Sequence, residues 1–403
     1  MKARCLSALA FLLACSTYSV ALGVSALFRL IPRRRRVRSG RLALIGTFFN
    51  ANWFVSHATP LARSGLQEVV VVTDEPQPAP PGVRFVCPPS WATGLLGRVG
   101  AKLLSLVGVG WKDDPDAFMG YHIFPNSIFA LIAGRLFGRP ACYQMTGGPI
   151  EVTNGGIDSE NRLFTLLRRP SPFLERLALA VVRQFDLIVV RGTSAKAFLR
   201  ERGVRAPIAI IPGSVDPARF QGRSERKWDM VFVGRLTDTK QPLQFVEILG
   251  RVAKELPSVR AVLFGDGPLL EEVRGLAERL RVGENLELRG RTSEVVPDLA
   301  ASRVFVLTSR SEGLSIAMAE AMMCGVVPVV ADVGDLSDLV QHAESGYLVP
   351  PGDTEAFASH VVALLKDARL WTRLSANATA AALAHVGIDR VTALWVEQLA
   401  TLC

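Results

Sequence analysis

Short apolar runs alternate with helix-like segments through the first half of the chain after residue 41. Helical spacing of apolar residues predicts helices at 127–138 and 173–185. Runs with the length and composition of strands lie at 42–49, 68–73, 84–87, 118–124, 141–145, 186–190 and 208–212. Because short apolar strands alternate with helices, we expect a parallel sheet that is covered on both faces.

The same pattern restarts after 213–228, a polar segment that Gly and Pro interrupt. Amphipathic or buried helices separate the predicted strands of this half, and only helices follow residue 350. These strands lie at 230–234, 260–265, 285–290, 304–309, 327–331 and 346–350. The sequence therefore predicts an α/β fold of two doubly wound, Rossmann-like domains facing a cleft. The predicted bounds are 41–215 and 216–385, followed by a helix at 386–403 that packs back on the first domain.

The N-terminus differs from the rest of the chain in charge. Residues 1–41 hold nine basic residues and no acid, whereas the whole chain has 46 basic and 37 acidic residues. Removing those nine leaves 37 basic against 37 acidic residues, so the body of the protein is neutral by count. The overall basic charge is therefore no argument for a nucleic-acid partner.

Residues 5–28 carry no charge, and a helix of this length crosses a hydrocarbon core of about 30 Å. The arginines that follow predict a membrane anchor at 1–40, with residues 29 onward on the cytoplasmic face of the inner (cell) membrane. Arginines would also contact anionic headgroups at the membrane surface. Two alternatives stay open: a cleaved signal sequence, and a helix lying in the interface, which Ser16, Thr17, Ser19 and Ser25 would suit.

Metal and disulfide chemistry find no support in the sequence. The six cysteines form no CxxC pair, and the five histidines are scattered along the chain. We expect reduced thiols, no metal site and no cofactor. The acidic run DDPD at 113–116 is interpreted as a surface loop rather than as a metal-binding segment.

Strand ends of the second half carry flexible or cationic residues, where doubly wound folds bind ligands. Arg235 and Lys240 share one loop, and such a pair suits a diphosphate, although an ordinary solvated loop is the alternative. No GxGxxG or Walker A motif is present. Further positions at these strand ends are Gly234, Gly265, Gly267, Arg291 and Thr292.

The segment SRSEGLSIAMAEAMMCGVVP at 309–328 holds two acids in an otherwise uncharged stretch. We expect a helix to begin at Leu314, so that the amides of Gly313, Leu314 and Ser315 form an anion site. Glu312 and Glu320 would then accept hydrogen bonds from sugar and ribose hydroxyls. The alternatives are a helix cap for Glu312 and an exposed acid on a long stem for Glu320.

Several motifs occur in an order that strongly resembles retaining glycosyltransferase family 4, which has the two-Rossmann GT-B fold. These motifs are FVGRLTDTK, LFGDGPLLEEV, the stretch from LRGRTSEVV to DLSDLV, and SGYLVPPGD. The resemblance is clear over 229–355 and looser over 42–215. It implies that Glu312 contacts the donor sugar, Glu320 the ribose, and Arg235 with Lys240 the diphosphate. By the same resemblance, the nucleotide base lies beside Arg291 and Thr292.

The first half is expected to bind the acceptor. The family often has a functional histidine after the strand that matches 118–124, which makes His122 a candidate for contact with the donor sugar. A structural histidine is the alternative for His122 and the favoured reading of His57. The segment 159–170 offers a basic amphipathic helix that would rest on the membrane or face solvent.

Together these features predict a retaining glycosyltransferase of the hexosyltransferase type. It would move a sugar from a nucleotide diphosphosugar, its co-substrate, to an acceptor hydroxyl. The membrane anchor favours a lipid-linked acceptor in polysaccharide or cell-envelope glycan synthesis. An inactive sugar-nucleotide-binding relative and a sugar-nucleotide epimerase of similar fold remain the alternatives.

Overall fold

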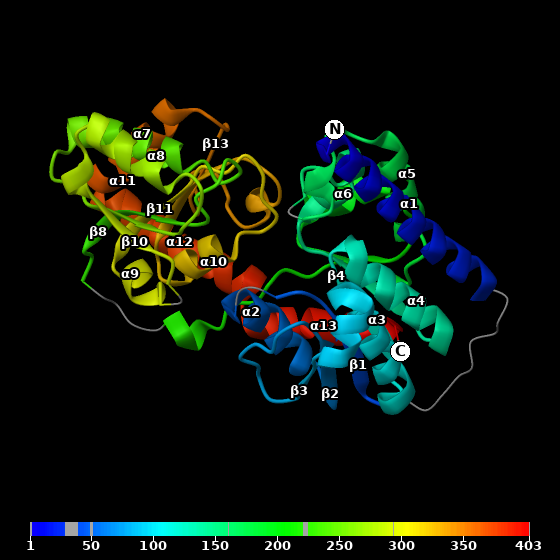
Figure 1. Cartoon of the computed structure of the whole chain (residues 1–403). Helices are drawn as coiled ribbons and strands as arrows, with labels where there is room; N and C mark the ends of the chain where they lie inside the picture. The colour runs from blue at the N-terminus through cyan, green and yellow to red at the C-terminus, as the bar shows by residue number, and fades with distance from the viewer. Residues whose placement is uncertain are drawn as a thin grey trace. The chain divides into compact units, whose positions relative to one another are not determined.

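The computed structural model describes residues 2–28, 39–48, 51–159, 161–220, 225–292 and 294–402. The arginine-rich flank expected at 29–38 lies outside the described residues. The chain divides into an N-terminal unit, Met1–Pro212 with Val391–Cys403, and a C-terminal unit, Gly213–Arg390 (Figure 1). The last segment of the chain thus belongs to the first unit.

A seven-stranded parallel sheet forms the centre of the N-terminal unit, in the order β3-β2-β1-β4-β5-β6-β7. Every residue of β4 and β5 is buried, as expected for a sheet covered on both faces. The chain order reverses between β1 and β4, which makes their carboxyl ends a topological switch point. The strands are β1 (Arg41–Ile45), β2 (Glu68–Val72), β3 (Val83–Val86), β4 (Ala117–Tyr121), β5 (Ala141–Met145), β6 (Leu187–Val190) and β7 (Ile208–Ile210).

Helices cover both faces of this sheet. One apolar cluster joins the sheet to α1 (Lys2–Phe28), α3 (Ser90–Asp113), α4 (Ile128–Phe137), α5 (Pro172–Val182) and α6 (Thr193–Glu201). A second cluster joins it to α2 (Ala51–Ala62) and α13 (Ile388–Leu402), whose Val391, Trp395 and Leu399 are buried. Short helical turns occupy η1 (Ile123–Ser127), η2 (Gly148–Glu151), η3 (Thr153–Gly155) and η4 (Phe164–Leu166).

The C-terminal unit repeats this plan with six parallel strands in the order β10-β9-β8-β11-β12-β13. Its switch point lies between β8 and β11, which pair directly. The strands are β8 (Trp228–Val233), β9 (Ala261–Phe264), β10 (Leu286–Gly290), β11 (Ser302–Leu307), β12 (Val327–Ala331) and β13 (Tyr347–Val349). The prediction of two doubly wound α/β sheets is confirmed.

Polar caps begin several helices of this unit: Asp353 accepts the amide of Ala356, and Asp367 accepts those of Arg369 and Leu370. The helices are α7 (Pro242–Glu255), α8 (Leu270–Arg279), α9 (Val296–Ala300), α10 (Ile316–Met323), α11 (Thr354–Lys366) and α12 (Ala368–Val386). Single turns lie at η5 (Pro217–Phe220), η6 (Gly283–Asn285) and η7 (Leu336–Asp338).

Some local predictions were wrong. The expected helix at 159–170 is only the short turn η4, and the long helix α3 was not predicted. The 113–116 segment is not simply a surface loop, because Asp116 is 5% exposed and accepts the amides of Ser39 and Gly40 at 2.8 Å each. Its carboxylate therefore ties the start of β1 to the start of β4.

Candidate functional site

The switch point of the C-terminal unit brings together the loops that follow β8 and β11. The amide of Arg310 donates to the carbonyl of Thr239 at 2.9 Å. The hydroxyl of Thr308 donates to the carbonyl of Gln241 at 2.8 Å. These bonds hold side by side two loops that are about 70 residues apart in sequence. They lie at the strand ends, where doubly wound folds bind ligands.

A cation and a carboxylate meet between these two loops. The ammonium of Lys240 lies 2.5 Å from Oε1 of Glu312, and the hydroxyl of Ser309 donates to the same oxygen at 2.6 Å. Both side chains are largely buried, with 19% of Lys240 and 8% of Glu312 exposed. We expected Lys240 to contact the diphosphate and Glu312 the donor sugar, whereas in the structure the two side chains contact each other. Glu312 thus orients the cation expected at the diphosphate.

Glycine allows the Glu312 loop to pack closely against the segment after β12. Gly334 has a φ of 59°, and a Cβ there would lie 1.9 Å from the carbonyl oxygen of Glu312. Close packing also explains why glycine occupies two of the positions that were predicted to bind the ligand. A Cβ on Gly265 would lie 1.8 Å from the carbonyl of Gly234, and one on Gly267 would lie 2.5 Å from that of Leu236. Both therefore let the β9 loop lie on the β8 loop, and their contact with a ligand stays a prediction.

Glu320 lies inside α10 and is only 8% exposed. Within the described part of the chain its carboxylate has no hydrogen-bonding partner. Burial raises the pKa of Glu320 to about 7, although the charge of Arg219 opposes that shift. A buried acid without a donor is suited to accept hydrogen bonds from a bound hydroxylic ligand.

The helix start differs by two residues from the prediction, because α10 begins at Ile316 rather than at Leu314. Ser315 is the N-cap, and its hydroxyl accepts the amide of Met318 at 3.3 Å. Gly313 and Leu314 lie in the partly exposed turn before the cap. The anion site expected at these amides therefore belongs to a loop that leads into a capped helix.

The other predicted ligand-binding side chains follow two strands that are not adjacent in the sheet. Arg235 is exposed directly after β8, and Arg291 and Thr292 are exposed after β10, at the edge of the sheet. Because β9 lies between β10 and β8, the two loops are separated by about 10 Å. This spacing is compatible with one extended ligand, and the roles of these residues stay predictions.

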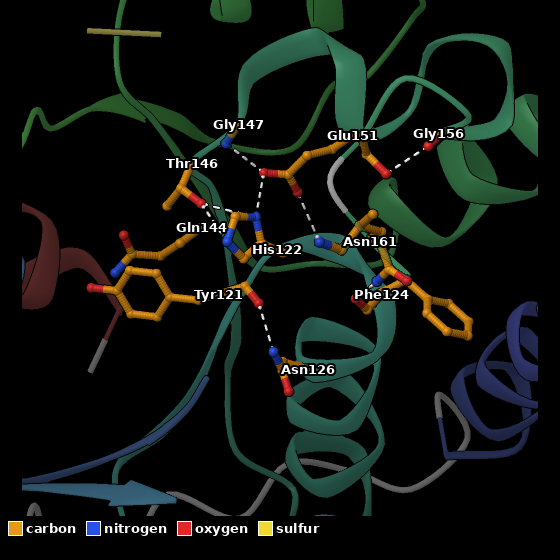
Figure 2. A network of polar contacts seen from close by, with 12 residues as sticks. Tyr121, His122, Phe124, Asn126, Gln144, Thr146, Gly147, Glu151, Gly156 and Asn161 are labelled. Atoms are coloured by element: carbon orange, nitrogen blue, oxygen red, sulfur yellow. Dashed lines mark hydrogen bonds and ion pairs between the residues drawn. The ribbon is translucent and has the colours of Figure 1, made fainter. Parts of the chain in front are cut away.

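In the N-terminal unit, His122 directly follows β4 at the other switch point (Figure 2). Its ring is half exposed, and its backbone has a φ of 59°, which is rare for a residue with a side chain. Nδ1 lies 3.0 Å from Oε1 of Glu151, and the hydroxyl of Thr146 lies 3.1 Å from the same nitrogen. The main chain of His122 donates to the carbonyl of Gln144 at 3.0 Å.

Glu151 is the buried centre of this network, with 4% of its side chain exposed. Its carboxylate also accepts the amide of Ile123 at 2.9 Å, the hydroxyl of Tyr143 at 2.9 Å and the amide of Gly147 at 2.6 Å. Burial alone would raise the pKa of Glu151, but His122 and these main-chain donors outweigh burial and hold the pKa below its usual range. Glu151 is therefore a carboxylate at neutral pH.

The charge on Glu151 fixes which nitrogen of His122 carries the proton. A carboxylate only accepts hydrogen bonds, so Nδ1 must be the donor in this contact. In the neutral ring Nε2 is then an acceptor, and the hydroxyl of Thr146 lies 3.2 Å from it. The half-exposed edge of His122 is thus prepared to accept a hydrogen bond from a hydroxyl. Glu151 was not predicted from the sequence. The only feature that could have indicated it is its position, as an acid three residues after the Gly-Gly pair at 147–148.

His57 has the structural role that was favoured for it. It is 5% exposed in α2, its Nδ1 lies 2.7 Å from the carbonyl of Trp53, and the two rings pack 4.2 Å apart. Burial lowers the pKa of His57 well below its ordinary value, so the ring is neutral. Among the described residues, no three His, Cys, Asp or Glu side chains gather closely enough to hold a metal ion.

Comparison with known proteins agrees with this geometry. Residues 215–381 match the model of the family described as glycosyl transferases group 1. N-acetyl-alpha-D-glucosaminyl L-malate synthase of Bacillus anthracis is 28% identical over 274 residues, which are 67% of this chain and 70% of the relative.

Two further proteins widen the comparison. The UDP-Gal:alpha-D-GlcNAc-diphosphoundecaprenol alpha-1,3-galactosyltransferase of Escherichia coli is 27% identical over 40% of this chain and 46% of its own length, so the chain spans less than half of it. The crystal structure of Anabaena HepE in complex with UDP superposes with a TM-score of 0.70 at 17% identity, over 90% of this chain and 100% of HepE. Residues 215–381 therefore form a domain of the glycosyl transferases group 1 family, and the chain is a glycosyltransferase with the GT-B fold.

Proposed function

We propose that the protein transfers a sugar, with retention of the anomeric configuration, from a uridine diphosphosugar to an acceptor hydroxyl. The observation that carries this proposal is the contact of Lys240, on the β8 loop, with Glu312, on the β11 loop, directly before α10, which holds the buried Glu320. Support for uridine comes from HepE, whose structure contains UDP, and from the E. coli relative, whose name specifies UDP-Gal.

In this proposal, the main task of the C-terminal unit is to stabilise the leaving diphosphate. Arg235 and Lys240 supply positive charge to oxygens that become more negative as the sugar departs. The amides of residues 313–315, in the turn that leads into α10, donate hydrogen bonds to the same anion. The carboxylate of Glu320 accepts the ribose hydroxyls, and Arg291 and Thr292 contact the base. No enzyme carboxylate needs to attack the sugar if acceptor and leaving group share one face.

His122 is the contribution that we assign to the N-terminal unit. Its Nε2, left as an acceptor by the contact between Nδ1 and Glu151, accepts a hydroxyl of the donor sugar. Glu151 is a positioning residue in this proposal, since it acts only through the imidazole. The resemblance to family 4, in which a functional histidine often follows the matching strand, supports this assignment.

We further propose a lipid-linked acceptor, used at the cytoplasmic face of the cell membrane. The support is the apolar helix α1, whose residues Cys5–Phe28 are long and apolar enough to cross a membrane. The E. coli relative is named for a diphosphoundecaprenol acceptor, whereas the B. anthracis relative is named for L-malate. Attachment to a membrane by such a helix would bring the enzyme to a lipid-linked acceptor.

The first test is calorimetric titration of the full chain with UDP, GDP, ADP and dTDP, beside Glu320→Ala and the exposed control Glu278→Ala. We expect UDP to bind the wild type and the control, and to bind the Glu320 variant much more weakly. Donor turnover is then followed with a polyprenyl-linked saccharide, and the anomeric configuration of the product is read by NMR. Binding without any turnover would identify a sugar-nucleotide-binding relative, and interconversion of the donor without acceptor would identify an epimerase.

A further inference from the structure

The helix α1 has one apolar row that is buried and another that is exposed. Ala10, Ala14, Tyr18 and Ala21 recur at helical spacing and are at most 1% exposed, because they pack against α4 and α5. The outer row is equally apolar, with side chains between 46% and 63% exposed: Leu6, Leu9, Leu12, Leu13, Val20 and Leu27. Most of α1 therefore lies along the N-terminal unit (Figure 1). Its outer row is an uncovered apolar surface.

A second helix of the same unit shows the same division. On α3, Ala101, Leu106 and Val109 face the sheet and are at most 3% exposed. Its outer side chains are unusually uncovered, with Leu95 76% and Trp111 86% exposed. A kink at Gly97, whose φ is 68°, divides α3 into two helical segments, and both carry exposed apolar side chains, which together are called the outer row of α3: Trp91, Leu95 and Leu96 before the kink, and Val99, Leu104 and Trp111 after it. Clustered exposure of large apolar groups on a water-soluble domain marks an interaction surface.

The two rows belong to the same side of the N-terminal unit. Both α1 and α3 pack against α4, which itself covers β1, β4 and β5. All three helices contribute to one apolar cluster over that face of the sheet. A flat partner that contacts the outer row of one helix is therefore close to the outer row of the other.

Exposed basic residues lie close to both rows. Arg98 and Lys112 are the exposed charged residues among the outer positions of α3, and no acid occurs from 90 to 112. Asp113, at the end of the helix, is paired with Arg84 at 2.8 Å. The turn η4 packs on α1 and is flanked by exposed arginines at 162, 168 and 169, with one exposed acid, Asp158, further upstream. Cations among exposed Leu and Trp match an anionic lipid surface.

We propose that the outer rows of α1 and α3 together form a membrane-contacting surface, and that α1 lies in the plane of an anionic lipid interface instead of crossing the bilayer. The inner row of α1 is already packed on α4 and α5, so a crossing helix would have to leave them and uncover their apolar side chains. Indole rings such as those of Trp91 and Trp111 favour the headgroup level. This inference rests on the membrane attachment proposed above and adds α3 as its second contact.

Vesicle binding of the full chain tests the proposal, with phosphatidylcholine vesicles compared with vesicles that also contain phosphatidylglycerol. Hydrogen exchange on bound vesicles should show new protection over 91–111 as well as over 5–27, with α4 remaining protected. The double variant Leu95→Glu and Val99→Glu should bind anionic vesicles about tenfold more weakly or worse, because apolar contact and cationic attraction are both reduced. The matched control places the same changes at Leu280 and Leu383, which are 41% and 52% exposed in the C-terminal unit.

Three results would overturn the proposal: no binding to anionic vesicles, protection of α1 without protection of α3, or loss of protection in α4, which a crossing α1 would cause. Because both replaced side chains are exposed, the variant should fold, and the circular dichroism spectrum and melting temperature of each sample verify this. The serine double variant at the same positions gives a milder test of the same contact. Sugar transfer in detergent separates the two proposals, since a chain that fails on vesicles but still transfers sugar retains the proposed transferase function.

Discussion

The carboxylate of Glu151 lies 3.0 Å from Nδ1 of His122 and also accepts two main-chain amides and the Tyr143 hydroxyl. The acid comes from η2 and the imidazole from the end of β4, which are neighbours because β4 pairs with β5. One buried negative charge thus fixes both the backbone after β4 and the orientation of the ring. This arrangement gives His122 a defined hydrogen-bonding face.

Replacing Glu151 should therefore lower turnover through His122. We expect Glu151→Gln to reduce kcat by roughly tenfold to a hundredfold, the usual cost of removing a partner that orients a functional histidine. KM for the donor should change little, because the proposed nucleotide contacts lie on the C-terminal unit. Steady-state kinetics measures both parameters.

The double variant Glu151→Gln with His122→Asn provides the control for that prediction. If Glu151 acts through His122, the two losses in kcat should be far from additive. Additive losses, or a fall in melting temperature without a fall in kcat, would show that Glu151 has a structural role only.

The Lys240–Glu312 pair predicts that stability and turnover can be separated. Lys240→Ala should lower kcat/KM by a factor on the order of a hundred to a thousand, as for other preorganised groups that stabilise developing charge. It should also destabilise the protein, because Glu312 is left largely buried without its cation. The exposed Lys254→Ala on α7 serves as the control and should change neither property.

Adding Glu312→Gln to Lys240→Ala should restore part of the melting temperature but none of the turnover, since it removes the unpaired charge without replacing the cation. Recovery of both properties together would mean that Lys240 serves the fold and not the diphosphate.

Burial of Glu320 predicts a dependence of stability on pH. Its pKa of about 7 lies above the unfolded value of 4.5, so the folded state binds the extra proton between these values. Ionising the buried carboxylate destabilises the folded state. This loss of stability is absent below pH 4.5, grows as the pH rises, and reaches on the order of 3 kcal/mol at about pH 7. Glu320→Gln should therefore raise the melting temperature at pH 8 but not at pH 5. The control Glu278→Gln on α8 should show no such difference.

The same carboxylate should couple proton release to nucleotide binding. In the proposed complex a ribose hydroxyl donates to the ionised acid, so UDP affinity should fall up to about tenfold per pH unit below 7. Calorimetry in buffers of different ionisation enthalpy should show protons released at pH 6.5, and the Gln variant should release none. Unchanged proton release in that variant would remove Glu320 from the ribose site.

Close packing at Gly334 predicts a sensitive position outside the ligand contacts. Gly334→Ala would place a methyl group 1.9 Å from the Glu312 carbonyl oxygen, and the Glu312 loop would have to move. We expect a loss of stability of about 2 kcal/mol and a clear loss of activity. Gly352→Ala is the matched control, because its φ is also positive but no atom lies within 4 Å of the added carbon. Equal activity of the two variants would contradict this reasoning.

The architecture of the C-terminal site was accessible from sequence because it depends on strand ends. Arg235, Lys240 and Glu312 follow short apolar strands whose parallel pairing could be expected from alternation with helices. What the sequence did not reveal is the contact between Lys240 and Glu312. Their 72-residue separation is closed only by the direct pairing of β8 with β11.

The helix α3 escaped prediction for a different reason. Its 24 residues include five glycines, which are poor helix formers, and apolar residues occur on both its inner and its outer face. Such a segment has little helical periodicity to detect. Glu151 was missed because its partners come from two different strand ends, and no local pattern marks a residue whose neighbours are distant in sequence.

The location of α13 has a consequence for the order in which the protein can fold. Trp395 and Leu399 are buried in the apolar cluster of the N-terminal unit, yet they are synthesised after the whole C-terminal unit. In most multidomain chains the first domain can finish folding while the rest is being made. Here the first unit must wait for α13, so its apolar face beside α2 stays uncovered until the C-terminal unit has been synthesised. A stop codon just before α13 would therefore damage the first unit made and leave the second one intact.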